Sequence, residues 1–544
     1  MDIRKFMAAV FVALMPVAGA SAQKNKNHNF EVAKNLDIFQ QIYKTLDLMY
    51  VDTLNPGEVI GTGIKAMLQS LDPYTTYYPE DKSKDLKMML TGKYAGIGSI
   101  VRKHQRLKNI VIEEPYKGMP AAELGLKKGD IILSIDGEDM TGKKVEEVSG
   151  KLRGEAGTNF ELKVRRPSTK ETLTLKVKRR SIKMPSIPYY GMRHDNIGYI
   201  NLADFTEGCA KAMRLAFIDL KKQGAEKLIL DLRGNGGGSL AEAVDIINMW
   251  VPKGITLVET RGKQKQSNRI YKTKVEPIDT LMPIVVLVND ETASASEITA
   301  GSLQDLDRGT IIGTRTYGKG LVQTPFDLPY NSNIKLTTGK YYIPSGRCVQ
   351  AINYKHSGGG YTERIPDSLT HVFHTRNGRE VRDGGGITPD IEIKPDTLPN
   401  IAVYLDRIDS TEVLFDYVVD YISSHPSIAD PSTFHISDAD YEDFKQRVLK
   451  SGFKYDQMSE KKLDELEKIA KFEGYYETAK AEFEALKNKL AHNIEYDLDR
   501  NKKDIIRLIE NDIITAYYFQ AGAIEAALNS DPVVKKAETV LNKE

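Results

Sequence analysis

A strand–turn–helix pattern that recurs between residues 195 and 395 constrains the fold more than any other feature of the sequence. Short apolar runs of the type that forms buried strands are followed by polar, glycine-rich or serine-rich turns and then by helix-forming segments. The strands are expected at Lys227–Leu232, Pro283–Val288 and Thr310–Gly313, and the helices at Leu240–Trp250 and Ser296–Asp305. Alternation of this kind predicts an α/β domain.

Three further regions flank this pattern, as a chain of 544 residues allows. Residues 36–71 carry apolar side chains at helical spacing and end in a turn at Leu71–Thr75. Residues 88–182 have the composition of short strands joined by turns, including a hairpin-type turn at Asp136-Gly137. From residue 400 onward the chain is rich in charged residues and is expected to be a solvated helical region.

The N-terminus indicates export. A basic start at Met1–Lys5 precedes an apolar run at Phe6–Ala20, and Ala20-Ser21-Ala22 has the form of a signal-peptide cleavage site. The apolar run is too short to span a bilayer comfortably, so we expect cleavage after Ala22 and a soluble mature protein outside the cytoplasm.

Composition narrows the function. The 76 basic and 75 acidic residues nearly balance, which argues against broad electrostatic binding of nucleic acid. The two cysteines cannot form a disulfide scaffold and match no zinc-binding spacing.

The densest chemical signal lies at residues 289–305, where an expected strand passes into an expected helix. A serine at such a junction, here Ser294, exposes its hydroxyl beside backbone N–H groups that favour a developing oxyanion. The alternative is a serine-rich helix cap, a role that Ser296 would fill equally well.

A second signal is Lys319, which lies between Gly318 and Gly320. A lysine can act as a base when burial lowers its pKa, and a serine–lysine pair is one variant of the serine-nucleophile mechanism. Gln323 follows four residues later and could orient the amine if the strand bends locally. The spacing from Gly313 to Lys319 also resembles a phosphate-binding loop, but Gly320 replaces the required Ser or Thr, and we reject that reading.

The third signal is the glycine cluster of Asp231–Leu240, between an expected strand and an expected helix. Glycines allow backbone N–H groups to converge on a ligand atom, as in an oxyanion hole. A tight strand-to-helix turn is the plainer alternative.

Taken in order along the chain, these motifs resemble the carboxyl-terminal processing proteases, also called tail-specific proteases. The resemblance extends over residues 36–395 and implies a serine endopeptidase that requires no cofactor and no metal. The site residues that it implies are the nucleophile Ser294, the base Lys319, the lysine-orienting Gln323, the oxyanion N–H groups of Gly237 and Ala295, and a supporting Asp305 as in some members.

The strand-rich region resembles the PDZ domain of the same family. Its carboxylate-binding loop corresponds to Ala95, Gly96, Ile97 and Gly98. Successive N–H groups of such a loop can capture a peptide's terminal carboxylate while the peptide adds to the sheet as a strand.

We therefore expect a multidomain α/β (α+β) protein with a PDZ β-sandwich-like domain and a protease core of the crotonase or Clp type. The expected boundaries are a signal peptide at 1–22, an N-terminal helical region at 23–87, the PDZ domain at 88–182, the protease core at 183–395 and a C-terminal helical accessory domain at 396–544.

The expected activity is cleavage of unfolded or tail-exposed proteins in the periplasm, or else at the membrane periphery or outside the cell. Expected partners are substrates with free apolar C-termini, and an adaptor protein or a second copy of the chain. Neither nucleic acid nor a transmembrane anchor after signal cleavage is expected. Two alternatives remain open: an inactive PDZ scaffold that binds peptides, and an envelope assembly hub.

Overall fold

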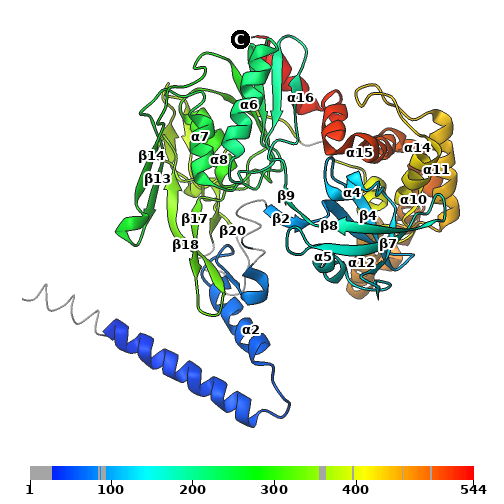
Figure 1. The fold of residues 1–544 in the computed structure, drawn as a ribbon, viewed down its shortest axis with the longest axis horizontal. Helices are drawn as coiled ribbons and strands as arrows, with labels where there is room; N and C mark the ends of the chain where they lie inside the picture. The colour runs from blue at the N-terminus through cyan, green and yellow to red at the C-terminus, as the bar shows by residue number, and fades with distance from the viewer. Residues whose placement is uncertain are drawn as a thin grey trace, which may run out of the picture. The chain divides into compact units, whose positions relative to one another are not determined.

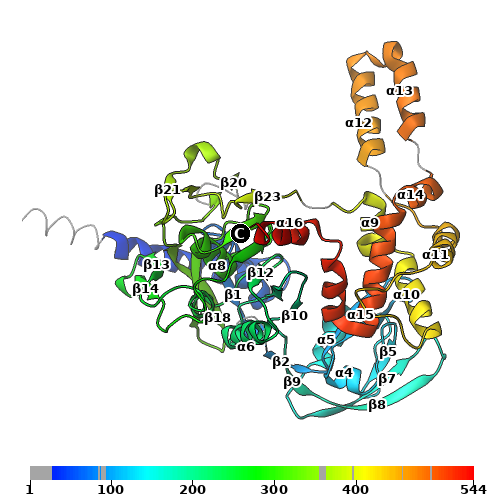
Figure 2. The same ribbon diagram turned by 90° about the horizontal axis from the view of Figure 1, so that it is seen from above.

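The structure is a computed structural model that describes residues 27–83, 86, 93–353, 363–394, 397–455, 458–490 and 493–543 (Figures 1 and 2). The expected signal peptide lies outside these residues. The chain divides into a unit of residues 1–77 and 354–361 and a second unit that holds the rest.

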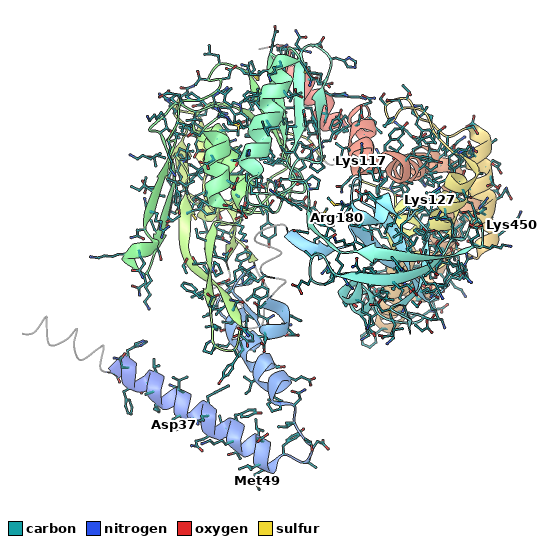
Figure 3. The ribbon with its side chains drawn as sticks, viewed as in Figure 1. Asp37, Met49, Lys117, Lys127, Arg180 and Lys450 are labelled. Carbon is teal, nitrogen blue, oxygen red and sulfur yellow. The ribbon has the colours of Figure 1, made fainter. Side chains whose placement is uncertain are left out.

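The first unit contains two helices, at residues 27–49 and α2 (Pro56–Gln69), and the start of β1 (Thr76–Tyr78). The predicted helical character of residues 36–71 is found in both helices, and the chain leaves the helical conformation between them at residues 50–55. Asn55 caps α2 by accepting from the Gly57 and Glu58 N–H groups, and Pro56 takes the first helical position. Asp37 and Met49 mark the first helix in Figure 3.

The strand-rich region forms an antiparallel sheet in the order β3-β4-β5-β7-β8, which encloses an apolar core of residues such as Ile112, Ile132 and Leu162. β3 is an edge strand of this sheet. The strands are β3 (Ser99–His104), β4 (Asn109–Pro115), β5 (Ile131–Ile135), β7 (Asn159–Arg165) and β8 (Thr172–Lys178), with β6 (Glu138–Asp139) paired to β5. The helices are α4 (Pro120–Glu123) and α5 (Val145–Leu152), and β2 (Lys93–Gly96) pairs with β9 (Arg180–Lys183).

The α/β region is built on a six-stranded sheet in the order β10-β11-β12-β15-β16-β23, in which only β10 runs antiparallel to its neighbour. Its strands are β10 (Tyr189–Met192), β11 (Ile197–Asn201), β12 (Lys227–Asp231), β15 (Ile284–Val288), β16 (Thr310–Gly313) and β23 (Ile391–Glu392). The predicted α/β fold and its three predicted strands are confirmed.

The central strands of this sheet carry apolar side chains on both faces, as expected for a sheet that helices cover on both sides. One face, with Leu230 and Val286, packs against α6 (Cys209–Lys222), α7 (Leu240–Ile247) and α8 (Ala295–Asp305). The other face, with Ile229 and Val285, packs against α16 (Pro532–Leu541) from the far C-terminus (Figure 1).

A second, antiparallel sheet lies beside α8 in the order β17-β18-β13-β14. Its strands are β17 (Leu321–Asp327), β18 (Asn333–Tyr342), β13 (Thr256–Gly262) and β14 (Arg269–Lys272). Shorter pairs are β19 (Ile352–Asn353) with β20 (Glu363–Arg364), and β21 (Val372–His374) with β22 (Glu380–Arg382).

The C-terminal region is helical, as predicted, and has its own core around Phe444, Ile505 and Ile509. The helices are α9 (Asn400–Val403), α10 (Val413–Ser424), α11 (Asp438–Ser451), α12 (Met458–Glu473), α13 (Tyr476–Leu490), α14 (Ile494–Arg500) and α15 (Lys502–Leu528), followed by α16. Figure 2 shows α12 and α13 side by side as a hairpin. Within the described ranges, no helix combines the length and the apolar character needed to cross a bilayer.

The C-terminal helices contact the strand-rich domain as well as the α/β domain. Phe415 and Val419 of α10 pack on Val111 and Ile131, and a side chain at Gly129 would collide with Val419. A buried lysine, Lys128, forms ion pairs beside this contact with Glu113 and Asp512.

Candidate active site

A cavity of about 520 Å³ opens at the carboxyl ends of the parallel strands, where ligands of open α/β sheets usually bind. Segments far apart in the sequence line it, among them the glycine cluster, the start of α8 and the start of β17. The cavity brings together five residues that the sequence singled out, namely Gly237, Ser294, Ala295, Lys319 and Gln323.

Ser294 is held in an unusual backbone conformation, with φ of 58° and ψ of −114°. It is the N-cap of α8, directly after the loop that follows β15. A non-glycine residue at positive φ is strained, and such strain persists only where the surroundings fix it, often at functional sites. Ser296, the other candidate cap, is fully buried and donates its hydroxyl to the Asn235 carbonyl oxygen at 2.9 Å.

Glu297 fixes this conformation from one turn further into α8. Its buried carboxylate accepts the Ser294 N–H at 2.9 Å and the Lys319 N–H at 2.8 Å on one oxygen. The other oxygen accepts the Gly318 N–H at 2.8 Å and the Thr316 hydroxyl at 2.6 Å. Burial raises the pKa of Glu297, and these four hydrogen bonds oppose that shift. One side chain therefore joins the backbones of the candidate nucleophile and the candidate base.

Glu297 lies within the segment 289–305 that the sequence singled out, but its role was not predicted. The signal was available, because a serine followed three residues later by glutamate is the pattern of a capping box.

Lys319 and Gln323 lie on either side of the start of β17. The β17–β18 ladder shifts register between Val322 and Gln323, which is the local bend that orientation of the lysine by Gln323 requires. The Gln323 amide nitrogen donates to the Thr337 hydroxyl at 3.3 Å, so its carbonyl oxygen is the group left for an amine. The Tyr341 hydroxyl lies 2.6 Å from the Lys319 carbonyl oxygen and 3.2 Å from that of Ser294.

Gly237 approaches the start of α8 too closely for any side chain. A Cβ atom there would lie 2.8 Å from the Ser294 Cβ and 2.9 Å from the Ala295 nitrogen, and φ is +96°. Its N–H donates to the side-chain oxygen of buried Asn235 at 2.9 Å. The sequence did not indicate that Asn235 accepts the N–H of Gly237, the expected oxyanion donor.

Asp305 lies at the other end of α8 and is not among the residues that line the cavity. Its carboxylate forms a buried ion pair with Arg347 at 2.8 Å and accepts the Ser345 N–H at 3.0 Å. Burial raises the pKa of Asp305 against the charge of Arg347.

A second lysine, Lys335 of β18, also lines the cavity. Among the described residues, no group of three or more His, Cys, Asp or Glu side chains could hold a metal ion.

The candidate carboxylate-binding loop leads from β2 into the edge strand β3. Ala95 and Gly96 end β2, and the carbonyl oxygens of Ile97 and Gly98 accept the N–H groups of Ala121 and Tyr116, both at 2.8 Å. Gly98 has φ of +72°, and a Cβ there would lie 2.4 Å from the Met119 Cβ. Only glycine fits this position.

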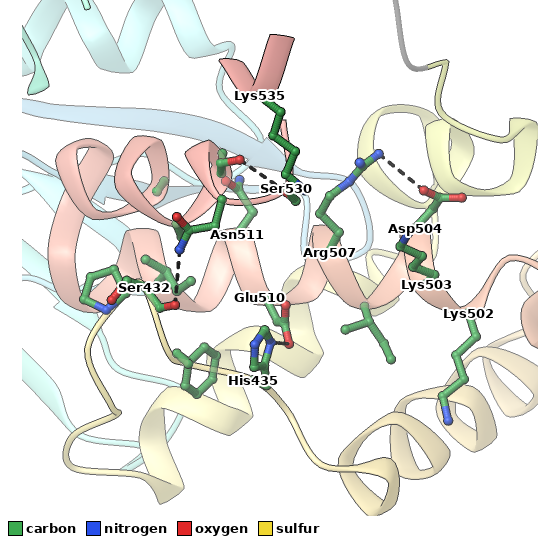
Figure 4. Close-up of a pocket in the computed structure, with 18 of the residues that line it drawn as sticks. Ser432, His435, Lys502, Lys503, Asp504, Arg507, Glu510, Asn511, Ser530 and Lys535 are labelled. Carbon is green, nitrogen blue, oxygen red and sulfur yellow. Dashed lines mark hydrogen bonds and ion pairs between the residues drawn. The ribbon is translucent and has the colours of Figure 1, made fainter. Parts of the chain in front are cut away.

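A larger cavity, of about 840 Å³, lies among the C-terminal helices and is shown in Figure 4. Several of its charged groups pair with one another, as His435 does with Glu510 at 3.1 Å and Arg507 with Asp504 at 3.3 Å. It contains none of the motif residues, so chemistry rather than size identifies the candidate active site.

A family model matches the part of the chain that carries this cavity. Residues 196–356 match the model described as peptidase family S41, residues 111–166 match a PDZ domain, and residues 404–541 match the C-terminal helical domain of probable PDZ-proteases. The carboxy-terminal-processing protease of Bartonella bacilliformis is 35% identical over 353 residues, which is 64% of this chain and 80% of that protein. The chain belongs to the carboxy-terminal processing proteases of family S41. The family resemblance expected from the sequence is thereby confirmed.

Other relatives carry the same description. The carboxy-terminal processing protease CtpA of Bacillus subtilis is 34% identical over 314 residues, 58% of this chain and 66% of that protein. A solved photosystem II D1 C-terminal processing protease is 29% identical, with a TM-score of 0.37 over 66% of this chain and 87% of that one. The protein is thus a serine-type peptidase with a PDZ domain ahead of its protease domain.

Proposed function

We propose that this protease is an exported endopeptidase that captures protein C-termini with its PDZ domain and cleaves by a Ser294–Lys319 mechanism. The observation that carries the proposal is the cavity in which a strained serine, a lysine, a glutamine and a glycine turn converge from three segments. Two of these segments share the Glu297 carboxylate, which fixes their backbones to each other.

In this mechanism, neutral Lys319 removes the proton from the Ser294 hydroxyl while the oxygen attacks the scissile carbonyl carbon. The tetrahedral intermediate collapses as the lysine gives the proton to the leaving amine, and an acyl-serine remains. A water molecule then repeats the sequence, with Lys319 as the base, and releases the new carboxylate. The Gln323 carbonyl oxygen accepts a hydrogen bond from the lysine amine and aims it at the serine.

The oxyanion of the intermediate accepts hydrogen bonds from the Ala295 and Gly237 N–H groups in this proposal. Because the Gly237 N–H donates to Asn235 in the structure, the oxyanion must share that proton or displace the Asn235 amide. Loss of one such donor costs about 10²–10³-fold in kcat in other enzymes.

Cleavage of an unfolded model protein tests the mechanism, with a chelator present throughout. Ser294→Ala and Lys319→Ala should both abolish turnover, and Lys335→Ala is the matched control because Lys335 lines the same cavity. Activity in Lys319→Ala together with inactivity in Lys335→Ala would show that Lys335, and not Lys319, is the base. Full activity in Ser294→Ala would refute the proposed nucleophile.

Capture of the carboxylate requires a separate test. The loop from Ala95 to Gly98 leads into β3, an edge strand of its sheet, to which an extended peptide could add as a strand. Amidation of a substrate's C-terminus should weaken its binding and slow its cleavage. Equal binding and cleavage of the free and amidated peptides would exclude this role for the loop.

Export, to the periplasm in our proposal, is supported by the N-terminal sequence alone. Fractionation of the producing cell and N-terminal sequencing of the mature protein test it, with a new terminus at Gln23 expected. An uncleaved chain in the cytoplasm would contradict the proposal.

A further inference from the structure

The last helix of the chain reaches the turn that carries the proposed oxyanion donor. Asp531 is the N-cap of α16 and accepts the Val533 N–H at 2.8 Å on one carboxylate oxygen. Its other oxygen forms an ion pair at 2.7 Å with the guanidinium of Arg233, and both side chains are mostly buried. Arg233 is four residues before Gly237.

Arg233 is held from two opposite sides. Its guanidinium also forms a two-oxygen ion pair with Asp231, at 2.6 and 3.0 Å, at the end of β12. Asp231 in turn accepts the hydroxyl of buried Tyr199 at 2.7 Å. Asp231 therefore fixes the guanidinium to the sheet, and Asp531 fixes it to the C-terminal helices.

The turn that follows Arg233 contacts the candidate nucleophile loop. The Gly234 N–H donates to the Asn289 side chain at 2.9 Å, and the Asn235 carbonyl oxygen accepts the Ala293 N–H at 3.0 Å. Asn235 also holds the Gly237 N–H. A shift of the Arg233 backbone would therefore displace Gly237 and the loop that precedes Ser294.

We propose that Asp531 is a positioning residue for catalysis, which makes the C-terminal helices part of the machinery that sets the oxyanion turn. The proposal rests on the proposed function, because it takes the Gly237 N–H as an oxyanion donor. Sequence reasoning could not find it, since the partners are 298 positions apart and neither lies in a recognisable pairing motif.

The test substitutes Asp531→Asn, which removes the charge but keeps a side chain that caps helices well. Glu538→Gln is the matched control, because Glu538 also joins α16 to the protease domain by a partly buried ion pair, with Arg193 at 3.0 Å. Arg193 lies between β10 and β11, outside the oxyanion turn. The two variants therefore remove equivalent ion pairs of the same helix, and only one of them reaches the turn.

We expect Asp531→Asn to lower kcat about tenfold at unchanged KM, less than the 10²–10³-fold loss of a whole donor. The rate at which a fluorophosphonate probe labels Ser294 should fall in parallel, because the phosphonyl oxygen occupies the same hole. Glu538→Gln should lower the unfolding temperature at least as much and leave kcat and labelling at the wild-type level. Asp531→Glu should recover most of the lost rate.

Equal kcat in Asp531→Asn and Glu538→Gln would overturn the inference and leave Asp531 a purely structural residue. If Asp531→Asn does not fold, Arg233→Lys replaces it, since a lysine keeps the charge but cannot bridge both carboxylates; wild-type kcat in that variant would equally overturn the inference. Failure of the proposed function looks different, because turnover and labelling by the wild type would then be independent of Ser294.

Discussion

The two ends of α8 hold buried carboxylates in opposite ways. Glu297, at the N-terminal end, is surrounded by neutral N–H and O–H donors and joins the two loops that carry Ser294 and Lys319. Asp305, at the C-terminal end, faces the guanidinium of Arg347 and lies outside the cavity. The Glu297 carboxylate thus holds the catalytic loops directly, whereas the Asp305 carboxylate acts on the site only through the fold around it.

The contrast shows how an acidic residue in a family motif can matter without touching substrate. Asp305 holds the segment after β18, in which the Gln350 side chain accepts the Gly320 N–H at 2.8 Å and the Ala351 N–H donates to the Gly318 carbonyl oxygen at 2.9 Å. This segment supports the loop that carries Lys319. Loss of the Asp305 carboxylate should therefore lower the stability of the protease domain first, and activity should fall as a consequence.

The largest effect should come from Asp305→Ala. It leaves the Arg347 guanidinium buried without its counter-ion, a change that typically destabilises a protein by about 3–5 kcal/mol. Denaturant unfolding of the protease domain should show this loss, and kcat should fall with it. A variant with normal unfolding and no activity would give Asp305 a direct role in catalysis and remove the contrast.

Glu297→Gln should lower activity as well as stability. The amide group of Gln would turn a donor toward two N–H or O–H groups, at about 1–3 kcal/mol for each unsatisfied buried group. Because those groups belong to the loops of Ser294 and Lys319, we expect kcat to fall about 10–100-fold with little change in KM, a loss of about 1.4–2.7 kcal/mol.

Glu242→Gln is the control for this variant. Glu242 also accepts two backbone N–H groups, from Gly208 and Ala210, at 2.8 Å each, but it serves the start of α6 rather than the catalytic loops. It should reduce stability and leave kcat unchanged. Similar kcat values in both variants would mean that Glu297 is no more than a helix cap.

Thr316→Val tests the Glu297 carboxylate by removing one of its hydrogen-bond donors. The buried Thr316 hydroxyl donates to Glu297 at 2.6 Å and accepts the Ile387 N–H at 2.7 Å, and valine keeps the shape while losing both bonds. We expect a loss of about 1–3 kcal/mol in unfolding free energy, because the buried Ile387 N–H is left without its acceptor, and a smaller fall in kcat than for Glu297→Gln. A larger fall in kcat than for Glu297→Gln would place the more important contact on the hydroxyl.

The order of strands and helices in the α/β domain could be predicted because each element has its own periodicity. Gly237, Ser294 and Lys319 could be found for a related reason, since they lie in glycine- or serine-rich segments next to strands. The break at residues 50–55 had a readable signal in Asn55-Pro56, an N-cap followed by proline, which the apolar spacing concealed. The ion pair of Asp531 with Arg233 had no local signal, because the docking of α16 is decided by tertiary packing alone.

The smallest expected effect is a pH dependence shared by both ends of α8. Burial raises the pKa of Glu297 and that of Asp305 above the values of about 4.3 and 3.9 for unfolded chains. A raised pKa means that the native state binds the proton more tightly, so the associated stability is present at low pH and is lost as pH rises through the folded-state pKa. The free-energy difference between wild type and Glu297→Gln should therefore shrink as pH rises from about 4.3, because only the wild type has this titration. Urea unfolding of both proteins between pH 4.5 and 8 measures it, and a difference that grows with pH would show that the four hydrogen bonds outweigh burial at Glu297.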